Sequence, residues 1–169
     1  VIDSIADAVA LVQSGDCAAL CTAPIHKQAL IVGAHFAYPG HTEYLADLAG
    51  RTSVVMMLAS DMLRVVPATI HIPLAQVPAK LTAATLTDTI LITHAALVRD
   101  FGIAKPRLAV AGLNPHAGEG GKIGLEELEM IIPTLDALRA EGLNITGPLS
   151  ADTMFHPAAR ATYDVAICM

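Results

Sequence analysis

Short apolar runs alternate along this chain with longer segments in which apolar residues recur at helical spacing. The helical pattern predicts helices at residues 2–13, 27–33, 41–48, 82–101 and from Leu125 up to Gly142. The apolar runs between them predict strands at residues 17–21, 53–58, 64–72, 107–111, 143–147 and 165–169. Since strands that alternate with helices form a sheet with helical cover, the expected fold class is α/β, with a mixed sheet flanked by helices.

Composition limits the kind of protein this is. Apolar residues make up 54% of the 169 residues and charged residues 15%, which predicts one cooperative unit with a sizeable core. The net charge of -6 comes without a cluster of Lys and Arg, which argues against a nucleic acid or a membrane surface as partner. No apolar run approaches the roughly 20 residues that span a bilayer.

Three cysteines are too few for a disulfide framework. They favour a reducing compartment, so we expect a cytoplasmic protein. Cys17 and Cys21 bound an apolar run, and we interpret them as small core residues of a buried strand rather than as metal ligands.

The helix predicted from Leu125 contains one conflict. Apolar residues line one face of it, and these are Leu125, Leu128, Ile131, Leu135 and Leu138. Pro133 lies inside this pattern and should kink the helix or split it. The acids Glu126, Glu127 and Glu129 fall in the first turns, where negative charge complements the helix dipole.

Residues 113–121, Leu-Asn-Pro-His-Ala-Gly-Glu-Gly-Gly, follow the strand predicted at 107–111. Ligands of open α/β sheets gather at the carboxyl ends of strands. Closely spaced glycines let backbone N–H groups approach an anion, and the neutral imidazole of His116 is a ligand for divalent metals. The alternative is a flexible turn with a solvated histidine. The density of functional groups favours an active-site loop that presents His116 to a metal beside a bound, phosphorylated substrate.

His71 is a polar residue in a nearly apolar predicted strand, just before Pro73. It is either a core histidine with a hydrogen-bond partner or a metal ligand delivered by the strand. Together with His116 it offers two imidazoles on adjacent strand ends, which would suit Zn, Co or Mn.

Two further segments carry polar side chains near predicted element ends. His41 and Thr42 open a helix, where free N–H groups and both side chains can hold an anion or a carboxylate; simple N-capping by Thr42 is the alternative. Asp152 follows a predicted strand and can ligate a metal or orient a histidine, and capping is an equal alternative.

These segments, taken in order, resemble the 4-hydroxythreonine-4-phosphate dehydrogenase family. The resemblance rests on residues 22–27, 40–43, 54–59, 69–74, 112–121 and 151–153. It implies an isocitrate and isopropylmalate dehydrogenase-like fold, a homodimer with an active site shared at the subunit interface, and NAD and a divalent metal (Zn, Co, Mg or Mn) as cofactors. It implies oxidation of 4-phosphooxy-L-threonine and decarboxylation of the β-keto acid, on the route to pyridoxal phosphate.

The resemblance also implies roles for particular residues. His71 and His116 match two of three metal-binding histidines, His41 and Thr42 match the substrate-contacting pair, and Asp152 matches a catalytic acid near the site. No residue is assigned to NAD, because the glycines at 118–121 are too closely packed for a Gly-x-Gly-x-x-Gly motif. Residues 1–169 correspond to the central portion of the two-domain enzyme, so the third metal ligand is expected beyond Met169.

Three alternatives remain open. The first is a different substrate for the same oxidation, because relatives in this family act on phosphorylated sugar acids such as 4-phosphoerythronate. The second is that residues 1–169 alone form an inactive structural or dimerisation module. His71, His116 and Asp152 by themselves would also suit a metal-dependent hydrolase.

Overall fold

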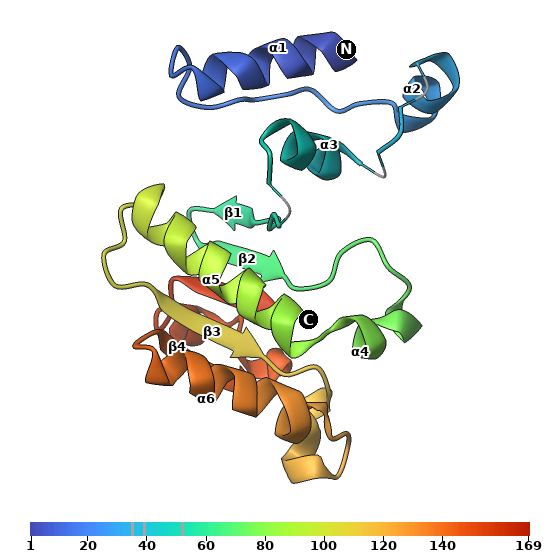
Figure 1. Ribbon diagram of the computed structural model, residues 1–169. Coiled ribbons are helices and arrows are strands. Elements are labelled where there is room, and N and C mark those ends of the chain that lie inside the picture. The colour runs from blue at the N-terminus through green and yellow to red at the C-terminus, as the bar shows by residue number, and fades with distance from the viewer. Residues whose placement is uncertain (35, 39, 52) are drawn as a thin grey trace. The chain divides into compact units, whose positions relative to one another are not determined.

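The computed structural model describes residues 1–34, 36–38, 40–51 and 53–169 and divides the chain into two compact units. Unit 1 is Val1–Val54 and unit 2 is Val55–Met169 (Figure 1). The sequence predicted one cooperative unit, because no linker or change in composition marks the boundary. Separate clusters of buried side chains explain the division, so each unit is described by itself.

The described residues of unit 1 form three helices, α1 (Ile2–Gln13), α2 (Lys27–Ala34) and α3 (His41–Leu48), at the predicted positions. Its small core includes Phe36 and Tyr44, whose rings pack edge to face with centroids 5.3 Å apart. The Tyr44 hydroxyl donates a hydrogen bond of 3.1 Å to the carbonyl of Ile2, which ties α3 to α1.

The strand predicted at residues 17–21 is wrong. These residues form an irregular segment, and Cys17 and Cys21 are exposed free thiols rather than core residues. A strand needs a partner for its backbone hydrogen bonds, and the described part of unit 1 contains no strand that could supply them.

Unit 2 is built on a five-stranded mixed sheet in the order β1-β2-β5-β3-β4. The hairpin of β1 (Leu58–Ser60) and β2 (Leu63–Pro67) is antiparallel. All other neighbours pair in parallel: β2 with β5 (Val165–Cys168), β5 with β3 (Arg107–Ala111), and β3 with β4 (Asn144–Leu149). The predicted mixed sheet flanked by helices is therefore confirmed.

The first two strands are shorter than predicted. Of residues 53–58 only Leu58 joins the sheet, and β2 ends at Pro67 instead of continuing to Ile72. The positive φ of 57° at His71 is incompatible with an extended strand. His71 therefore lies in a loop that follows β2.

Two long helices cover one face of the sheet. Figure 1 shows α5 (Ala83–Arg99) and α6 (Ile132–Ala140) in front of the strands. Thr82 caps α5 as predicted, because its hydroxyl accepts a hydrogen bond of 3.1 Å from the Thr85 N–H. The fully buried side chains of these helices and of the facing strand residues form one cluster, which includes Leu86, Ile90, Leu97, Leu135, Leu138, Leu108, Val110, Val165 and Ile167.

The other face of the sheet carries smaller side chains. Because neighbouring strand residues point to opposite faces, Ala109, Ala111 and Ala166 meet Met154 and Tyr163 in a second, smaller cluster. These last two residues flank α7 (Pro157–Arg160).

The helix predicted from Leu125 is split, as Pro133 suggested. A π turn at Glu127–Ile131 (η3) precedes α6, and Pro133 occupies the first turn of α6, where a missing N–H is tolerated. The predicted apolar face is correct from Ile131 onward. Leu125 and Leu128 are exposed instead, and the buried side chains of the π turn are Glu127 and Ile131.

The remaining described helices of unit 2 are short: η1 (Leu74–Gln76), α4 (Val77–Lys80), η2 (Pro115–Gly121) and η4 (Ala151–Thr153). No single helix among the described residues is long and apolar enough to cross a bilayer. The pair Leu74–Lys80 and Ala83–Arg99 together has the required length and composition but is bent by 90°.

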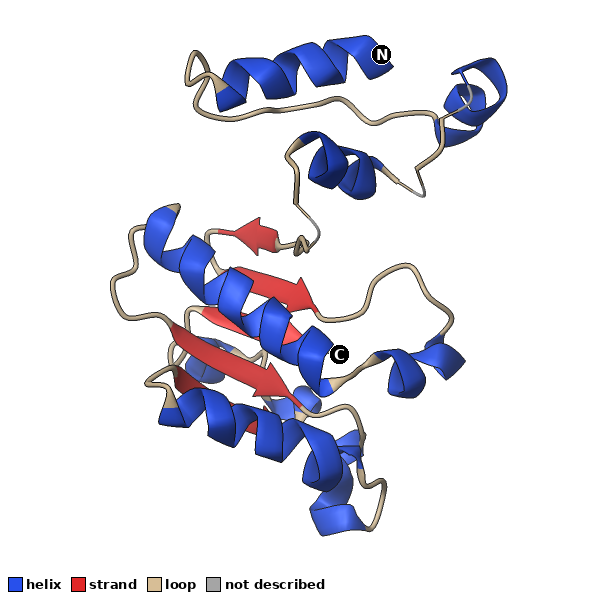
Figure 2. Cartoon of the chain, in the orientation of Figure 1, coloured by secondary structure: helices blue, strands red, loops and turns tan. Residues whose placement is uncertain are grey.

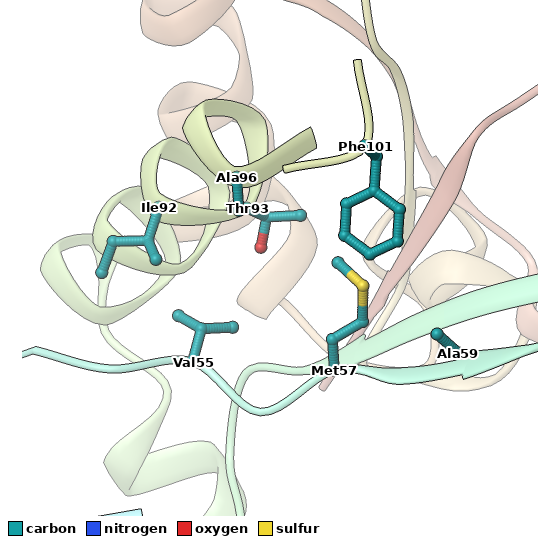
Figure 3. Close-up of a pocket in the computed structure, with 7 residues that line it drawn as sticks. All are labelled: Val55, Met57, Ala59, Ile92, Thr93, Ala96 and Phe101. Carbon is teal, nitrogen blue, oxygen red and sulfur yellow. The ribbon is translucent and has the colours of Figure 1, made fainter. Parts of the chain in front are cut away.

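An apolar pocket of about 200 Å³ lies between α5 and residues 55–59 (Figure 3). Its lining is Val55, Met57, Ala59, Ile92, Thr93, Ala96 and Phe101. Thr93 is 1% exposed, and its hydroxyl has no hydrogen-bond partner among the residues that the structure describes.

Candidate functional site at the carboxyl edge of the sheet

The parallel strands bring the loops of unit 2 that carry polar side chains to one edge. Since β2, β5, β3 and β4 share one direction, their carboxyl ends lie on the same side; the arrowheads of β2 and β3 are visible in Figure 2. The loop after β2 carries His71, the loop after β3 carries His116, and the loop after β4 carries Ser150 and Asp152. This is the edge at which open α/β sheets bind ligands.

His116 and Asp152 are brought together at this edge. The Nδ1 atom of His116 lies 3.9 Å from Oδ2 of Asp152 and 3.5 Å from the hydroxyl of Ser150. Ser150 in turn donates a hydrogen bond of 2.5 Å to Oδ1 of Asp152. Ser150 was not among the residues singled out from the sequence, because a serine after a strand carries no signal of its own.

The charges in this group are consistent with an ionised carboxylate next to an imidazole. The hydrogen bond from Ser150 lowers the pKa of Asp152, and the nearby His116 lowers it further. Both side chains remain more than half exposed, at 58% for His116 and 60% for Asp152. They line an open pocket of about 390 Å³, together with residues 112–115 and 150–151.

The loop that carries His116 has an unusual backbone. His116, Ala117 and Glu119 have positive φ values of 51°, 52° and 47°, and Gly118 and Gly120 between and after them are also left-handed. Non-glycine residues adopt this region at a cost of roughly 1–2 kcal/mol each. Such outliers cluster at ligand-binding sites and persist only where the surroundings hold them.

Glu127 provides much of that hold. It is 1% exposed, and its two carboxylate oxygens accept hydrogen bonds from the backbone N–H of Asn114 at 2.7 Å and from the Asn114 side-chain amide at 2.9 Å. The same amide donates to Glu126 at 2.7 Å. Glu127 lies in the first turn of η3, where the sequence placed an acid, and its side chain is in addition a buried acceptor for the loop.

His71 and His116 do not lie on adjacent strand ends. The order β2-β5-β3 places one strand between them, so two inter-strand spacings, about 10 Å in all, separate the ends of β2 and β3. His71 is exposed and left-handed, and we find no hydrogen bond or ion pair for it within the described residues. Met169 follows β5 at the position between the two histidine loops.

The other two candidate residues belong to unit 1. His41 and Thr42 form the first turn of α3, but the N-cap position is Gly40, so the interpretation of Thr42 as N-cap is wrong. The Nε2 atom of His41 is buried and has no hydrogen-bond partner in the part of the chain that the structure covers.

The described ranges contain no group of three His, Cys, Asp or Glu side chains close enough to hold a metal ion. Two imidazoles at one edge nevertheless have the right donor chemistry for part of such a site. The predicted roles of His41, Thr42, His71, His116 and Asp152 remain predictions.

Comparison with known proteins gives a consistent result. Residues 1–169 match the family model described as pyridoxal phosphate biosynthetic protein PdxA. A protein named 4-hydroxythreonine-4-phosphate dehydrogenase from Roseobacter denitrificans is 66% identical over 100% of this chain and 52% of its own length. One of the same name from Paracoccus denitrificans is 59% identical over 99% of this chain and 53% of its own length.

Two solved structures extend the comparison. A 4-hydroxythreonine-4-phosphate dehydrogenase from Klebsiella pneumoniae superimposes with a TM-score of 0.91 at 40% identity, over 99% of this chain and 50% of that one. A terephthalate 1,2-cis-dihydrodioldehydrogenase from Burkholderia xenovorans has a TM-score of 0.76 at 28% identity, over 97% and 51%. This chain thus spans about half the length of the relatives it matches.

Proposed function

The chain belongs to the family of the pyridoxal phosphate biosynthetic protein PdxA, and on that premise we propose that it is the central portion of an enzyme that oxidises 4-hydroxythreonine-4-phosphate. The observation that carries this proposal is the 66% identity, over the full chain, to a relative named for that reaction. The polar cluster at the carboxyl edge of the sheet supports it, because it lies where this class of sheet binds ligands.

The proposed reaction transfers a hydride from the carbinol carbon to NAD and releases the hydroxyl proton, which leaves a ketone. The β-keto acid then loses its carboxylate as carbon dioxide, on the route to pyridoxal phosphate. A divalent metal, when bound, would supply Lewis-acid chemistry that lowers the pKa of the alcohol. NAD is the hydride acceptor in this proposal, and no residue of this chain is assigned to it.

His71 and His116 are the proposed metal ligands. The loops after β2 and β3 deliver them to one edge, and the end of β5 lies between these loops. A third ligand carried on the continuation of β5 beyond Met169 would therefore enter between the two histidines. This topology supports the predicted set of three ligands.

Asp152 and Ser150 are proposed to orient His116. Both face Nδ1 of the imidazole, at 3.9 and 3.5 Å. Because the Ser150 hydroxyl donates to Asp152, it can only accept from Nδ1, so we assign the proton to Nδ1 and leave Nε2 for a metal. His116, held in this way, presents one defined tautomer to the pocket.

His41 and Thr42 are proposed to bind the substrate. The buried Nε2 of His41 lacks a partner among the described residues, and a polar substrate group would satisfy it. The proposal also includes a homodimer that shares its active site, and a cytoplasmic location.

The test uses the full-length protein with NAD, a divalent metal and 4-hydroxythreonine-4-phosphate, and follows the formation of NADH by its absorbance. His71→Ala and His116→Ala should each abolish turnover. His94→Ala is the matched control, because His94 lies in the half of α5 that leads to the amino end of β3, away from the site. Unchanged turnover in both site variants would disprove the metal assignment.

The substrate itself needs a separate comparison. A second candidate is a phosphorylated sugar acid such as 4-phosphoerythronate, and the structural neighbour named for a dihydrodiol shows that dehydrogenases of this shape are not restricted to one substrate. Initial rates with 4-hydroxythreonine-4-phosphate, 4-phosphoerythronate and a cis-dihydrodiol should rank the first highest. A higher kcat/KM for either of the others would replace the proposed substrate.

Two other interpretations are tested by separate measurements. A metal-dependent hydrolase would release product without NAD, so turnover that needs NAD excludes it. The inactive structural module is the alternative for residues 1–169 alone, and it would bind no metal. Tight binding of Zn²⁺ by that fragment, lost in its His116→Ala variant, therefore contradicts it.

A further inference from the structure

The backbone of the His116 loop does not hold its conformation through local sequence alone. Three of its residues that carry side chains, His116, Ala117 and Glu119, are left-handed. At roughly 1–2 kcal/mol each, the conformation costs several kcal/mol relative to an ordinary turn. Contacts elsewhere must offset this cost, or His116 would not stay at the edge of the sheet.

The loop packs closely around the Glu127 carboxylate. Both of its oxygens accept hydrogen bonds from Asn114, two residues before His116. The backbone also closes on the carboxylate from the other side: a Cβ added to Gly118 would lie 2.7 Å from Oε2, and one added to Gly112 would lie 3.1 Å from Oε1. The glycines at 112 and 118 therefore leave the space that the carboxylate fills.

Packing alone does not account for an acid at this position. Glu127 is 1% exposed, and no Lys, Arg or His forms an ion pair with it among the residues described. Burial of a carboxylate without a cation is costly, and an apolar side chain would fill the same space at lower cost. The advantage of the carboxylate is that it accepts two hydrogen bonds from one loop residue and so fixes the direction in which the loop leaves β3.

We propose that Glu127 is a positioning residue, which holds the left-handed turn through Asn114 and so sets the place of His116 for metal binding. The metal-binding part of this inference rests on the proposed function. The ordering of the loop does not, since it follows from the contacts of the protein itself.

The experiment compares Glu127→Gln and Asn114→Ala with Glu129→Gln in the full-length protein. A glutamine amide in place of the Glu127 carboxylate would offer one acceptor and one donor where the loop presents two donors, so one hydrogen bond is lost and two N–H groups face each other. Asn114→Ala removes the side-chain bonds to Glu127 and Glu126 from the loop side and keeps the Glu127 side chain in place, which guards against a Glu127 variant that does not fold. Glu129 is exposed in the same π turn and is the matched control.

Two readouts separate loop order from activity. Hydrogen–deuterium exchange of residues 113–121, without metal, should be about tenfold faster or more in Glu127→Gln and in Asn114→Ala, and unchanged in Glu129→Gln. Titration with Co²⁺ alone should show affinity reduced by roughly 10–100-fold in the first two variants.

Unchanged exchange in the loop of both variants would overturn the proposal. Faster exchange throughout unit 2 in Glu127→Gln, with normal Co²⁺ affinity in Asn114→Ala, would also overturn it, because Glu127 would then be a general packing residue. If the wild-type protein bound no Co²⁺ and made no NADH, the proposed function would fail, and the exchange comparison would still decide whether Glu127 orders the loop.

Discussion

The Oδ2 atom of Asp152 lies 3.9 Å from Nδ1 of His116, although 36 positions separate the two residues in the chain (152 − 116). The parallel pairing of β3 with β4 makes this possible, because it brings the loops that follow both strands to one edge. Each loop contributes one member of an acid–imidazole pair.

This pair predicts the effect of Asp152→Asn. The amide that replaces the carboxylate carries no negative charge, and it can either donate a hydrogen bond to the imidazole or accept one from it. The tautomer of His116 is therefore less well defined. Affinity for Co²⁺ should fall roughly 10–100-fold and kcat should fall with it, as measured by titration and by NADH formation. Asp88→Asn, on an exposed position of α5, is the control and should change neither. Normal metal affinity in Asp152→Asn would contradict the orienting role.

Gly118→Ala and Gly120→Ala should differ sharply. Both positions are left-handed, at φ values of 79° and 65°, so each substitution costs about 1 kcal/mol through the backbone. Only the Cβ at 118 would also meet a carboxylate oxygen at 2.7 Å, whereas nothing lies within 4 Å at 120. We expect Gly118→Ala to weaken Co²⁺ binding strongly and Gly120→Ala to leave it near wild type. Equal effects would mean that the loop does not pack on Glu127.

Thr93→Val should stabilise the protein. The Thr93 hydroxyl is buried against the apolar pocket without a hydrogen-bond partner among the described residues, and Val has the same shape without that hydroxyl (Figure 3). The free energy of unfolding should rise by about 1 kcal/mol, measured by urea denaturation. Thr134→Val is the contrasting variant, because Thr134 donates a hydrogen bond of 2.7 Å to the Met130 carbonyl, and its loss should lower stability. If the free energy of unfolding changed with the same sign in both variants, the unpaired hydroxyl of Thr93 would not explain the effect.

The ion pair between Arg107 and Asp164 predicts a pH dependence of stability. Arg107 donates to Asp164 through its guanidinium at 2.9 Å, and this contact lowers the pKa of the Asp164 carboxyl. Because the folded pKa is below the unfolded value of about 3.9, the stabilisation is present above that pH and is lost as the pH falls through the folded pKa. The difference in thermal midpoint between wild type and Asp164→Asn should therefore be largest above about pH 4 and should shrink in more acidic solution. Glu141→Gln serves as the control: its difference in thermal midpoint from wild type should not shrink in the same way as the pH falls.

Sequence reasoning succeeded where a local pattern determines the structure. Thr82 and the periodic apolar residues after it specify a capped helix within one segment, and the run at 107–111 is a strand whose pairing needs no special side chain. The glycine density at 113–121 likewise indicated a loop after that strand. In each case the information lies within a few residues of the element itself.

It failed where the outcome depends on partners far along the chain. The run from Cys17 to Cys21 has the composition of a strand but no neighbour to pair with in unit 1 as described. The sequence placed Glu127 in a first helical turn. It gave no sign that the side chain is a buried acceptor for Asn114, which lies 13 positions earlier in the chain. His71 and His116 were expected on neighbouring strands because sequence order suggests it, whereas the sheet inserts β5 between them.

That insertion has a consequence for how unit 2 folds. β5 comes after the other four strands in the chain, yet it pairs with both β2 and β3. During synthesis, the backbone edges of β2 and β3 that pair with β5 therefore stay without that partner until residues 165–168 have left the ribosome. Contacts between segments so far apart form slowly, and open strand edges invite pairing with other chains. A chaperone, or rapid docking of β5, would be most valuable to this protein during that interval.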